Sequence, residues 1–228
     1  MGACYIVGAG DFHGSFTPGD GDLVIAADGG YLELKKRGIR CDILLGDMDS
    51  LSELGESPES LGLVESASTS FGTSERAKSS ERTPEILKFK VEKDETDTHL
   101  AYVEGARRGY KTFYIYGGTG GREDHTFANY SLLLYGKNRG NSITLVGKSR
   151  EFFVIKNESI SLIRERGKDL SVFAFGGAAH GVTVKGAKYE AENVTLTSDF
   201  PLGVSNSFLD GEVTVSVADG ALLLMVEK

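Results

Sequence analysis

Two aspartates near the end of an apolar run have the spacing of metal ligands. In GDMDSL, residues 46–51, Asp47 and Asp49 stand on either side of a methionine, directly after the run DILL. Carboxylates two positions apart in a turn or extended segment can both reach one ion, and their hard oxygen atoms suit Mg²⁺. A single aspartate after a strand is more often a turn or cap residue. The pair is therefore interpreted as a metal site only together with further acids.

Further aspartates follow other apolar runs, namely Asp28, Asp94, Asp97 and Asp124. Ligands of open α/β sheets bind outside the carboxyl ends of the strands, so the sequence predicts that these acids gather at one edge. Such a cluster repels itself unless cations neutralise it. Mg²⁺ together with bound phosphate oxygens would provide that neutralisation.

The segment GGTGGREDH, residues 117–125, is a candidate phosphate site. Its four glycines within five residues permit close backbone approach, and the helix predicted after them offers unpaired N–H groups to an anion. Arg122 adds a planar fork of donors. The alternative is a flexible turn, which has little need of Arg, Asp and His beside the glycines. A phosphate site with metal carboxylates elsewhere indicates a nucleoside triphosphate and phosphoryl-type transfer.

Two other glycine motifs are weaker. VGAGDFHG, residues 7–14, has His13 where a dinucleotide fingerprint has its third glycine, which disfavours an NAD-dependent oxidoreductase. VGKS, residues 146–149, has Ser142 where a phosphate loop has its first glycine. We interpret Lys148 in that motif as a turn residue.

Strand and helix patterns alternate from residue 3 to about residue 147. The apolar runs each end in Gly, Asp or a charged residue, and they are CYIVGAG, DLVIAADGG, CDILLGD, ILKFKV, TFYIYGG and SITLVG. Helical patterns lie between them over residues 31–38, 94–109 and 125–140, and the second is expected to pack through Leu100, Val103 and Ala106. This alternation predicts an α/β fold, a Rossmann-like parallel sheet with helices on both faces.

After about residue 150 the helical period disappears. Seven short runs predict an antiparallel sandwich or barrel: EFFVI, SISLI, LSVFAF, GVTVKGAKY, NVTLT, EVTVSVA and ALLLMV. The sequence therefore predicts two domains, residues 1–145 and 146–228. Residues 51–85, rich in Ser, Glu and Thr, read as a solvated loop, either a flap over the site or a tolerated insertion.

Composition limits the kinds of binding partner and the cellular compartment that we expect for this protein. A net charge of −8 disfavours non-specific nucleic-acid binding. No stretch is apolar for long enough to span a membrane, and the N-terminus has no basic region of a secretory signal. The only cysteines, Cys4 and Cys41, are expected to be reduced core residues. We therefore expect a cytoplasmic protein with no membrane and no nucleic-acid partner.

Taken in order, five motifs resemble those of the thiamin pyrophosphokinase family, whose members transfer pyrophosphate from ATP to thiamin. They are AADGG, GDMDSL, EKDETDT, GGTGGREDH and PLGVSNSF. The match runs from about residue 22 to the C-terminus. The resemblance implies an α/β nucleotide-binding catalytic domain, a β-sandwich that binds thiamin, Mg²⁺ as cofactor, ATP as co-substrate, and a homodimer with sites at the subunit interface.

The resemblance also implies an acidic catalytic site, formed by Asp28, Asp47, Asp49, Asp94 and Asp97. Asp47, Asp49 and Asp97 would hold the metal. Asp94 or Asp97 would accept the proton of the thiamin hydroxyl group.

Binding roles follow in the same way. ATP would be bound by Asp28, Gly29, Gly30, Thr119, Gly120, Gly121 and Arg122. The other substrate would be bound by Asp124, His125, Ser205 and Asn206, the last two against the pyrimidine ring. The chain has no tryptophan to stack on that ring, so Phe208 or another aromatic would take this role.

Two rival functions remain open at this point. One is the same transfer to another hydroxymethyl acceptor such as a pterin, and the segment SNSF, residues 205–208, favours thiamin over it. The other is a non-catalytic module that holds Mg-nucleotide. Read without the family, SNSF is a Ser/Asn turn before a strand.

Overall fold

The computed structural model describes residues 2–46, 83–89 and 94–228. The chain divides into two compact units, Met1–His125 and Thr126–Lys228. The predicted boundary between residues 145 and 146 stays a prediction. Asp47, Asp49 and residues 51–82 of the predicted polar loop lie outside the described residues. In the described ranges, no helix is both long and apolar enough to cross a bilayer.

The first unit is built on a parallel sheet. Its strands are β1 (Cys4–Val7), β2 (Leu23–Ala27), β3 (Ile43–Gly46), β4 (Glu85–Lys88) and β5 (Thr112–Tyr116). They lie side by side in the order β5-β1-β2-β3-β4, and every neighbouring pair is parallel. The chain moves outward from β1 to β4 and then places β5 on the other side of β1. The strand order therefore reverses between β1 and β5, which is where doubly wound sheets bind ligands.

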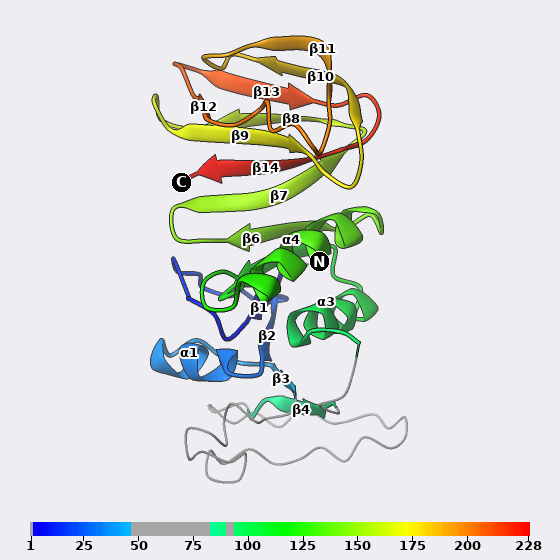
Figure 1. Cartoon of the computed structure of the whole chain (residues 1–228). Coiled ribbons are helices and arrows are strands. Elements are labelled where there is room, and N and C mark those ends of the chain that lie inside the picture. The colour runs from blue at the N-terminus through cyan, green and yellow to red at the C-terminus, as the bar shows by residue number, and fades with distance from the viewer. Residues whose placement is uncertain (1, 47–82, 90–93) are drawn as a thin grey trace. The chain divides into compact units, whose positions relative to one another are not determined.

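Helices cover this sheet from two sides. α1 (Gly30–Lys36) and α3 (Asp97–Arg107) both contact β2, and Figure 1 shows them on either side of that strand. All five residues of β2 are buried, as expected of a parallel strand covered on both faces. The predicted parallel sheet with helices on both faces is confirmed.

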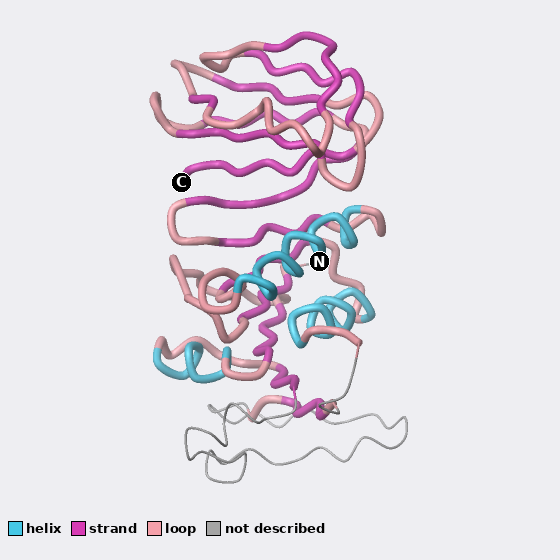
Figure 2. Tube along the Cα trace, viewed as in Figure 1, coloured by secondary structure: helices cyan, strands magenta, loops and turns pink. Residues whose placement is uncertain are grey.

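The connection from β1 to β2, residues 8–22, contains no helix (Figure 2). Instead, its Phe16 stacks on Tyr5 of β1 with ring centres 4.4 Å apart. Tyr116 of β5 lies 4.7 Å from the Phe16 ring and 5.2 Å from the Phe12 ring. These rings cover sheet surface that a crossover helix would otherwise cover, an arrangement that the sequence patterns did not predict.

The buried face of α3 differs from the predicted one. Val103 is 42% exposed, so the predicted face of Leu100, Val103 and Ala106 is wrong. The buried residues are Ala101, Tyr102 and Gly105. A β-carbon at Gly105 would lie 2.8 Å from the Phe113 ring, and Tyr102 packs on the same ring at 4.9 Å. The helix is therefore oriented by a glycine contact and an aromatic pair rather than by its aliphatic side chains.

The second unit begins within α4 (Glu123–Lys137), and its strands pair antiparallel in two groups. One contains β12 (Asn206–Ser207), β9 (Asp169–Ala174), β14 (Ala221–Glu227), β7 (Arg150–Lys156) and β6 (Ser142–Val146), in that order. The other contains β11 (Ala191–Leu196), β10 (Ala179–Lys185), β13 (Glu212–Ser216) and β8 (Ser159–Ile163). Leu222 and Leu224 of the first sheet share one buried cluster with Val213 and Val215 of the second. The predicted antiparallel β fold is confirmed.

Two segments of this unit form pairings that the sequence patterns did not indicate. The run SITLVG contains β6, which pairs antiparallel with β7. The Gly147 N–H donates to the Arg150 carbonyl at 2.9 Å, so the connection is a tight turn, and a tight turn permits only antiparallel pairing. The segment SNSF contains β12, a two-residue strand paired with β9. Cys4 and Cys41 are buried free thiols, as predicted.

Candidate functional site

Two glycine-rich loops run side by side where the strand order reverses. One follows β1 and the other follows β5. Backbone hydrogen bonds join them: Gly8 N–H to the Tyr116 carbonyl at 2.8 Å, Gly10 N–H to Gly117 at 2.8 Å, and Asp11 N–H to Thr119 at 2.9 Å. The predicted phosphate segment thus has a second backbone segment beside it. The sequence signal for that segment is the motif VGAGDFHG, which by itself is only an incomplete dinucleotide fingerprint.

Glycine is required where these loops touch. Gly117 has φ +62°, a left-handed conformation that costs an L-residue about 1–2 kcal/mol. A β-carbon there would lie 2.3 Å from the Gly8 carbonyl oxygen, well inside van der Waals contact. The glycines therefore let two backbones approach as closely as hydrogen bonding demands, and they leave the edge lined by peptide groups.

The end of β2 lies at the same edge. Asp28 has φ +50°, and its N–H donates to the Leu45 carbonyl of β3 at 2.7 Å. This places Asp28 beside Gly46, whose β-carbon would lie 3.2 Å from that of Asp28. Gly46 is the residue before Asp47 in the sequence. Gly30 at the start of α1 lies closer still to β1, because a β-carbon there would lie 1.9 Å from the Val7 oxygen.

The N-terminus of α3 also reaches this edge. Thr96 caps the helix by accepting the His99 N–H at 3.2 Å, and Asp97 occupies the first turn, where a carboxylate favours the helix dipole. The Thr98 hydroxyl oxygen lies 3.6 Å from the position of a β-carbon on Gly8. Thr98 is therefore held next to the β1 loop, one residue after Asp97, whereas Asp94 is exposed ahead of the helix.

Arg122 and Asp124 form an exposed ion pair at the start of α4. The Arg122 Nη2 donates to Asp124 Oδ2 at 2.6 Å, and the His125 N–H donates to Asp124 Oδ1 at 2.9 Å. The guanidinium hydrogen bond holds the pKa of the Asp124 carboxyl below its usual value. The side chains are 71% and 65% exposed, so the pair is worth little in stability and can exchange with a ligand.

Ser205 and Asn206, the predicted substrate contacts of the second unit, have different environments. Ser205 is exposed, with φ +59°. Asn206 is 9% exposed, and its amide bonds both backbone groups of Tyr189. Phe208, the predicted stacking ring, is 1% exposed and lies in the core, whereas Tyr189 is 61% exposed. Phe208 is therefore buried, and Tyr189 is an accessible ring bonded to Asn206 through its backbone.

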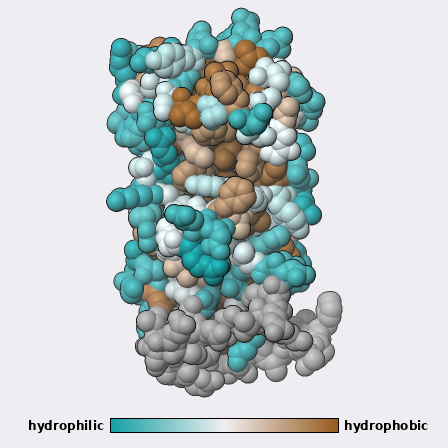
Figure 3. All heavy atoms as spheres, viewed as in Figure 1, coloured by the Kyte–Doolittle hydropathy of each residue, from teal (hydrophilic) through white to brown (hydrophobic). Residues whose placement is uncertain are grey.

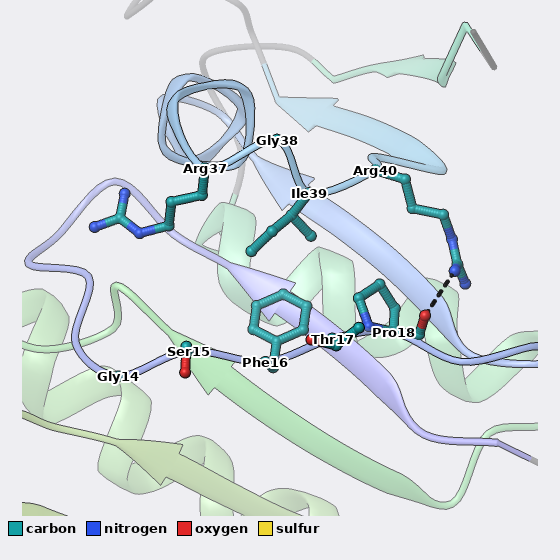
Figure 4. Close-up of a pocket in the computed structure, with 9 residues that line it drawn as sticks. All are labelled: Gly14, Ser15, Phe16, Thr17, Pro18, Arg37, Gly38, Ile39 and Arg40. Carbon is teal, nitrogen blue, oxygen red and sulfur yellow. Dashed lines mark hydrogen bonds between the residues drawn. The ribbon is translucent and has the colours of Figure 1, made fainter. Parts of the chain in front are cut away.

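A cavity of about 600 Å³ lies elsewhere in the first unit (Figure 4). It is lined by residues 14–18 and 37–40, none of them a predicted site residue. Arg40 spans it by donating to the Pro18 carbonyl at 3.1 Å, and it also binds the Gly19 and Asp22 carbonyls. Its lining comes from the connection between β1 and β2 and from the residues after α1, not from the predicted site residues.

Asp28, Gly29 and Gly30 thus follow β2 beside the end of β1, Asp97 is the first residue of α3, and Thr119, Gly120, Gly121 and Arg122 follow β5. In the part of the chain that the structure describes, no three Asp, Glu, His or Cys side chains are close enough to form a metal site. The predicted ligands Asp47 and Asp49 are not in that part.

The fold and this edge define a doubly wound α/β protein with an appended antiparallel β domain. Comparison with known families is specific. Residues 19–145 match the model described as "Thiamin pyrophosphokinase, catalytic domain", and residues 157–222 match "Thiamin pyrophosphokinase, vitamin B1 binding domain". The chain belongs to the thiamin pyrophosphokinase family.

Individual relatives agree. The thiamine pyrophosphokinase of Bacillus subtilis (strain 168) is 27% identical over 204 residues, which cover 89% of this chain and 86% of that protein. The crystal structure of the enzyme from Bacillus subtilis has a TM-score of 0.82 at 24% identity and covers 99% of both chains. That from Geobacillus thermodenitrificans has a TM-score of 0.76 at 21% identity, covering 99% of this chain and 97% of the other. These structures share the fold.

Proposed function

We propose that this chain transfers the pyrophosphoryl group of Mg-ATP to the hydroxyethyl oxygen of thiamin, giving thiamin diphosphate and AMP. The observation that carries the proposal is the pair of hydrogen-bonded glycine loops at the β1/β5 reversal, in a segment that matches the family's catalytic domain. Backbone N–H groups beside a helix N-terminus favour a polyphosphate at this edge.

The reaction depends on positioning the two substrates and neutralising phosphate charge rather than on a covalent enzyme intermediate. The thiamin hydroxyl oxygen bonds to the β-phosphorus, the bond from that phosphorus to the oxygen bridging to the α-phosphate breaks, and AMP leaves with that oxygen. The hydroxyl proton passes to a carboxylate, and Asp97 or Asp94 takes that role. Arg122 exchanges Asp124 for a phosphate oxygen, because a planar guanidinium binds both groups in the same way.

Mg²⁺ belongs to the proposal as well. Carboxylate oxygens are the donors that a hard cation prefers. The proposed ligands are Asp97, the first residue of α3, and Asp47 and Asp49, which follow Gly46 in the sequence. When bound, the ion would neutralise the charge that develops on the phosphate oxygens. Surplus carboxylates would also attract the positive thiazolium ring of thiamin.

Thiamin recognition falls to the second unit. Tyr189, Ser205 and Asn206 lie within the segment that matches the vitamin B1-binding domain. Tyr189 offers the exposed ring for the pyrimidine, in place of the buried Phe208. Exposed Ser205, the residue before Asn206, offers a hydroxyl group. A pterin acceptor is not favoured, because this match is to a thiamin-binding domain.

We further propose a homodimer with sites at the subunit interface, located in the cytoplasm and without nucleic-acid or membrane partners. Phe200, Leu202 and Val204 are each at least 50% exposed, next to the proposed thiamin contacts. Figure 3 shows hydrophobic side chains at the surface of the second unit. Light scattering during gel filtration would test the assembly, since a single 24.5 kDa species would contradict it.

Product analysis tests the function. Purified protein with MgATP and thiamin should release AMP and form thiamin diphosphate in equal amounts. ADP with thiamin monophosphate would indicate a simple kinase. Nucleotide binding without products, under conditions in which the Bacillus subtilis enzyme turns over, would indicate a non-catalytic module.

A further inference from the structure

Three hydrogen bonds hold the side chain of Asn206 inside the protein. Its Oδ1 accepts the Tyr189 N–H at 2.9 Å and the Ser207 N–H at 2.9 Å, and its Nδ2 donates to the Tyr189 carbonyl at 2.7 Å. Both backbone groups of Tyr189 are thus paired with one amide, as they would be with a neighbouring strand. With 9% of its surface exposed, Asn206 has little left to offer a ligand.

This clamp is the last of a series of bonds that fix the Lys188–Tyr189 turn. The Lys188 N–H donates to the Ser207 carbonyl at 2.9 Å, and Ala187 forms an antiparallel bridge with Phe208. β12, which contains Asn206 and Ser207, also pairs with β9, where Asn206 lies opposite Leu170. The short strand β12 therefore ties the turn after β10 to the opposite sheet of the sandwich.

Ser205 is held by a separate contact. Its N–H donates to the Ser171 hydroxyl at 3.2 Å, and its left-handed φ of +59° turns the chain just before β12. Exposed Ser205 and exposed Tyr189 are therefore presented from the two sides of one buried amide. Their relative orientation depends on Asn206.

We propose that Asn206 is a positioning residue that acts on thiamin through Tyr189, by fixing the backbone that carries the exposed ring, and that it does not contact thiamin itself. The inference rests on the proposed function, because it needs thiamin to be the molecule bound. It differs from the direct pyrimidine contact that family resemblance implies for this asparagine.

A double-mutant cycle separates the two roles. Initial rates of AMP release are measured against thiamin concentration for the wild type, Asn206→Ala, Tyr189→Ala and the double variant. Each single change should raise the thiamin KM by about tenfold, the equivalent of one lost aromatic contact, with kcat changed far less. The double variant should have the KM of Tyr189→Ala alone. A KM in the double variant that multiplies the two single effects would show direct contact and overturn the proposal.

Two further variants keep the result interpretable. Asn157→Gly removes another asparagine that bonds a backbone N–H, that of Gly220 at 2.9 Å, at a residue with φ +52°. It should leave the thiamin KM unchanged, whereas a tenfold rise would show that any lost clamp in this unit has the same effect. Asn206→Asp keeps the acceptor oxygen, so the cycle can be repeated with it if the alanine variant does not fold. Wild-type protein that forms no thiamin diphosphate would instead refute the proposed function.

Discussion

Gly117→Ala tests whether the contact between the two glycine loops builds the site. The matched control is Gly38→Ala, because both glycines have φ +62° and a β-carbon at Gly38 meets nothing within 4 Å. Both variants therefore carry the same backbone penalty, about 1–2 kcal/mol. They differ only in what the added methyl group meets.

The difference between the variants can be worked from the contact. A β-carbon at Gly117 would lie 2.3 Å from the Gly8 oxygen, so the loops must move apart by about 1 Å to reach a normal contact distance. That movement stretches the hydrogen bonds from Gly8 and Gly10, which are 2.8 Å long. Losing them adds about 1–3 kcal/mol beyond the control.

Two assays read this difference. Urea unfolding should show Gly117→Ala to be less stable than Gly38→Ala by that amount, and the KM for ATP should rise at least about tenfold only in Gly117→Ala. If the two variants unfold at the same urea concentration and bind ATP equally well, the loops do not form the nucleotide site and the reasoning is refuted.

Three further predictions follow from the site. Asp47→Asn together with Asp49→Asn should leave the unfolding midpoint unchanged and remove nearly all AMP release, and retained turnover would take these residues out of the metal site. Arg122→Gln should raise the pKa of Asp124 toward its usual value in a carboxyl NMR titration, because the guanidinium favours the ionised carboxylate. In the wild type the ion pair therefore persists at neutral pH and is lost only as the pH falls through the lowered pKa of Asp124. An unchanged pKa in the variant would contradict this. Asn206→Ala should lower the free energy of unfolding by about 1–3 kcal/mol in urea, since two part-buried backbone groups of Tyr189 lose their partner, and a loss below about 0.5 kcal/mol would contradict the clamp.

Local sequence patterns predicted where helices and strands lie better than they predicted which residues those elements bury against one another. Gly38 after a basic last turn marked the end of α1, and alternating runs marked the strands of the second unit, because both signals are short-range. The buried face of α3 could not be read in this way. It depends on Gly105 fitting against Phe113, a residue of a different element.

The candidate site shows the same limit. Strand ends and glycines pointed to Asp28 and to residues 117–122, because the carboxyl edge of a parallel sheet follows from strand order. The partnership of Gly8 and Gly10 with that segment needs β1 and β5 to be neighbours, which only the topology reveals. The burial of Asn206 and Phe208 was equally hidden, since β12 is too short to leave a periodic signal.

The most direct measurement of the central claim is a crystal structure with α,β-methylene ATP, Mg²⁺ and thiamin, in which the bond to be broken is blocked. The triphosphate is predicted to lie between the loop after β1 and residues 117–122, with Arg122 on a phosphate oxygen. A nucleotide bound instead in the cavity beside Phe16 and Arg37, with the glycine loops untouched, would contradict the account.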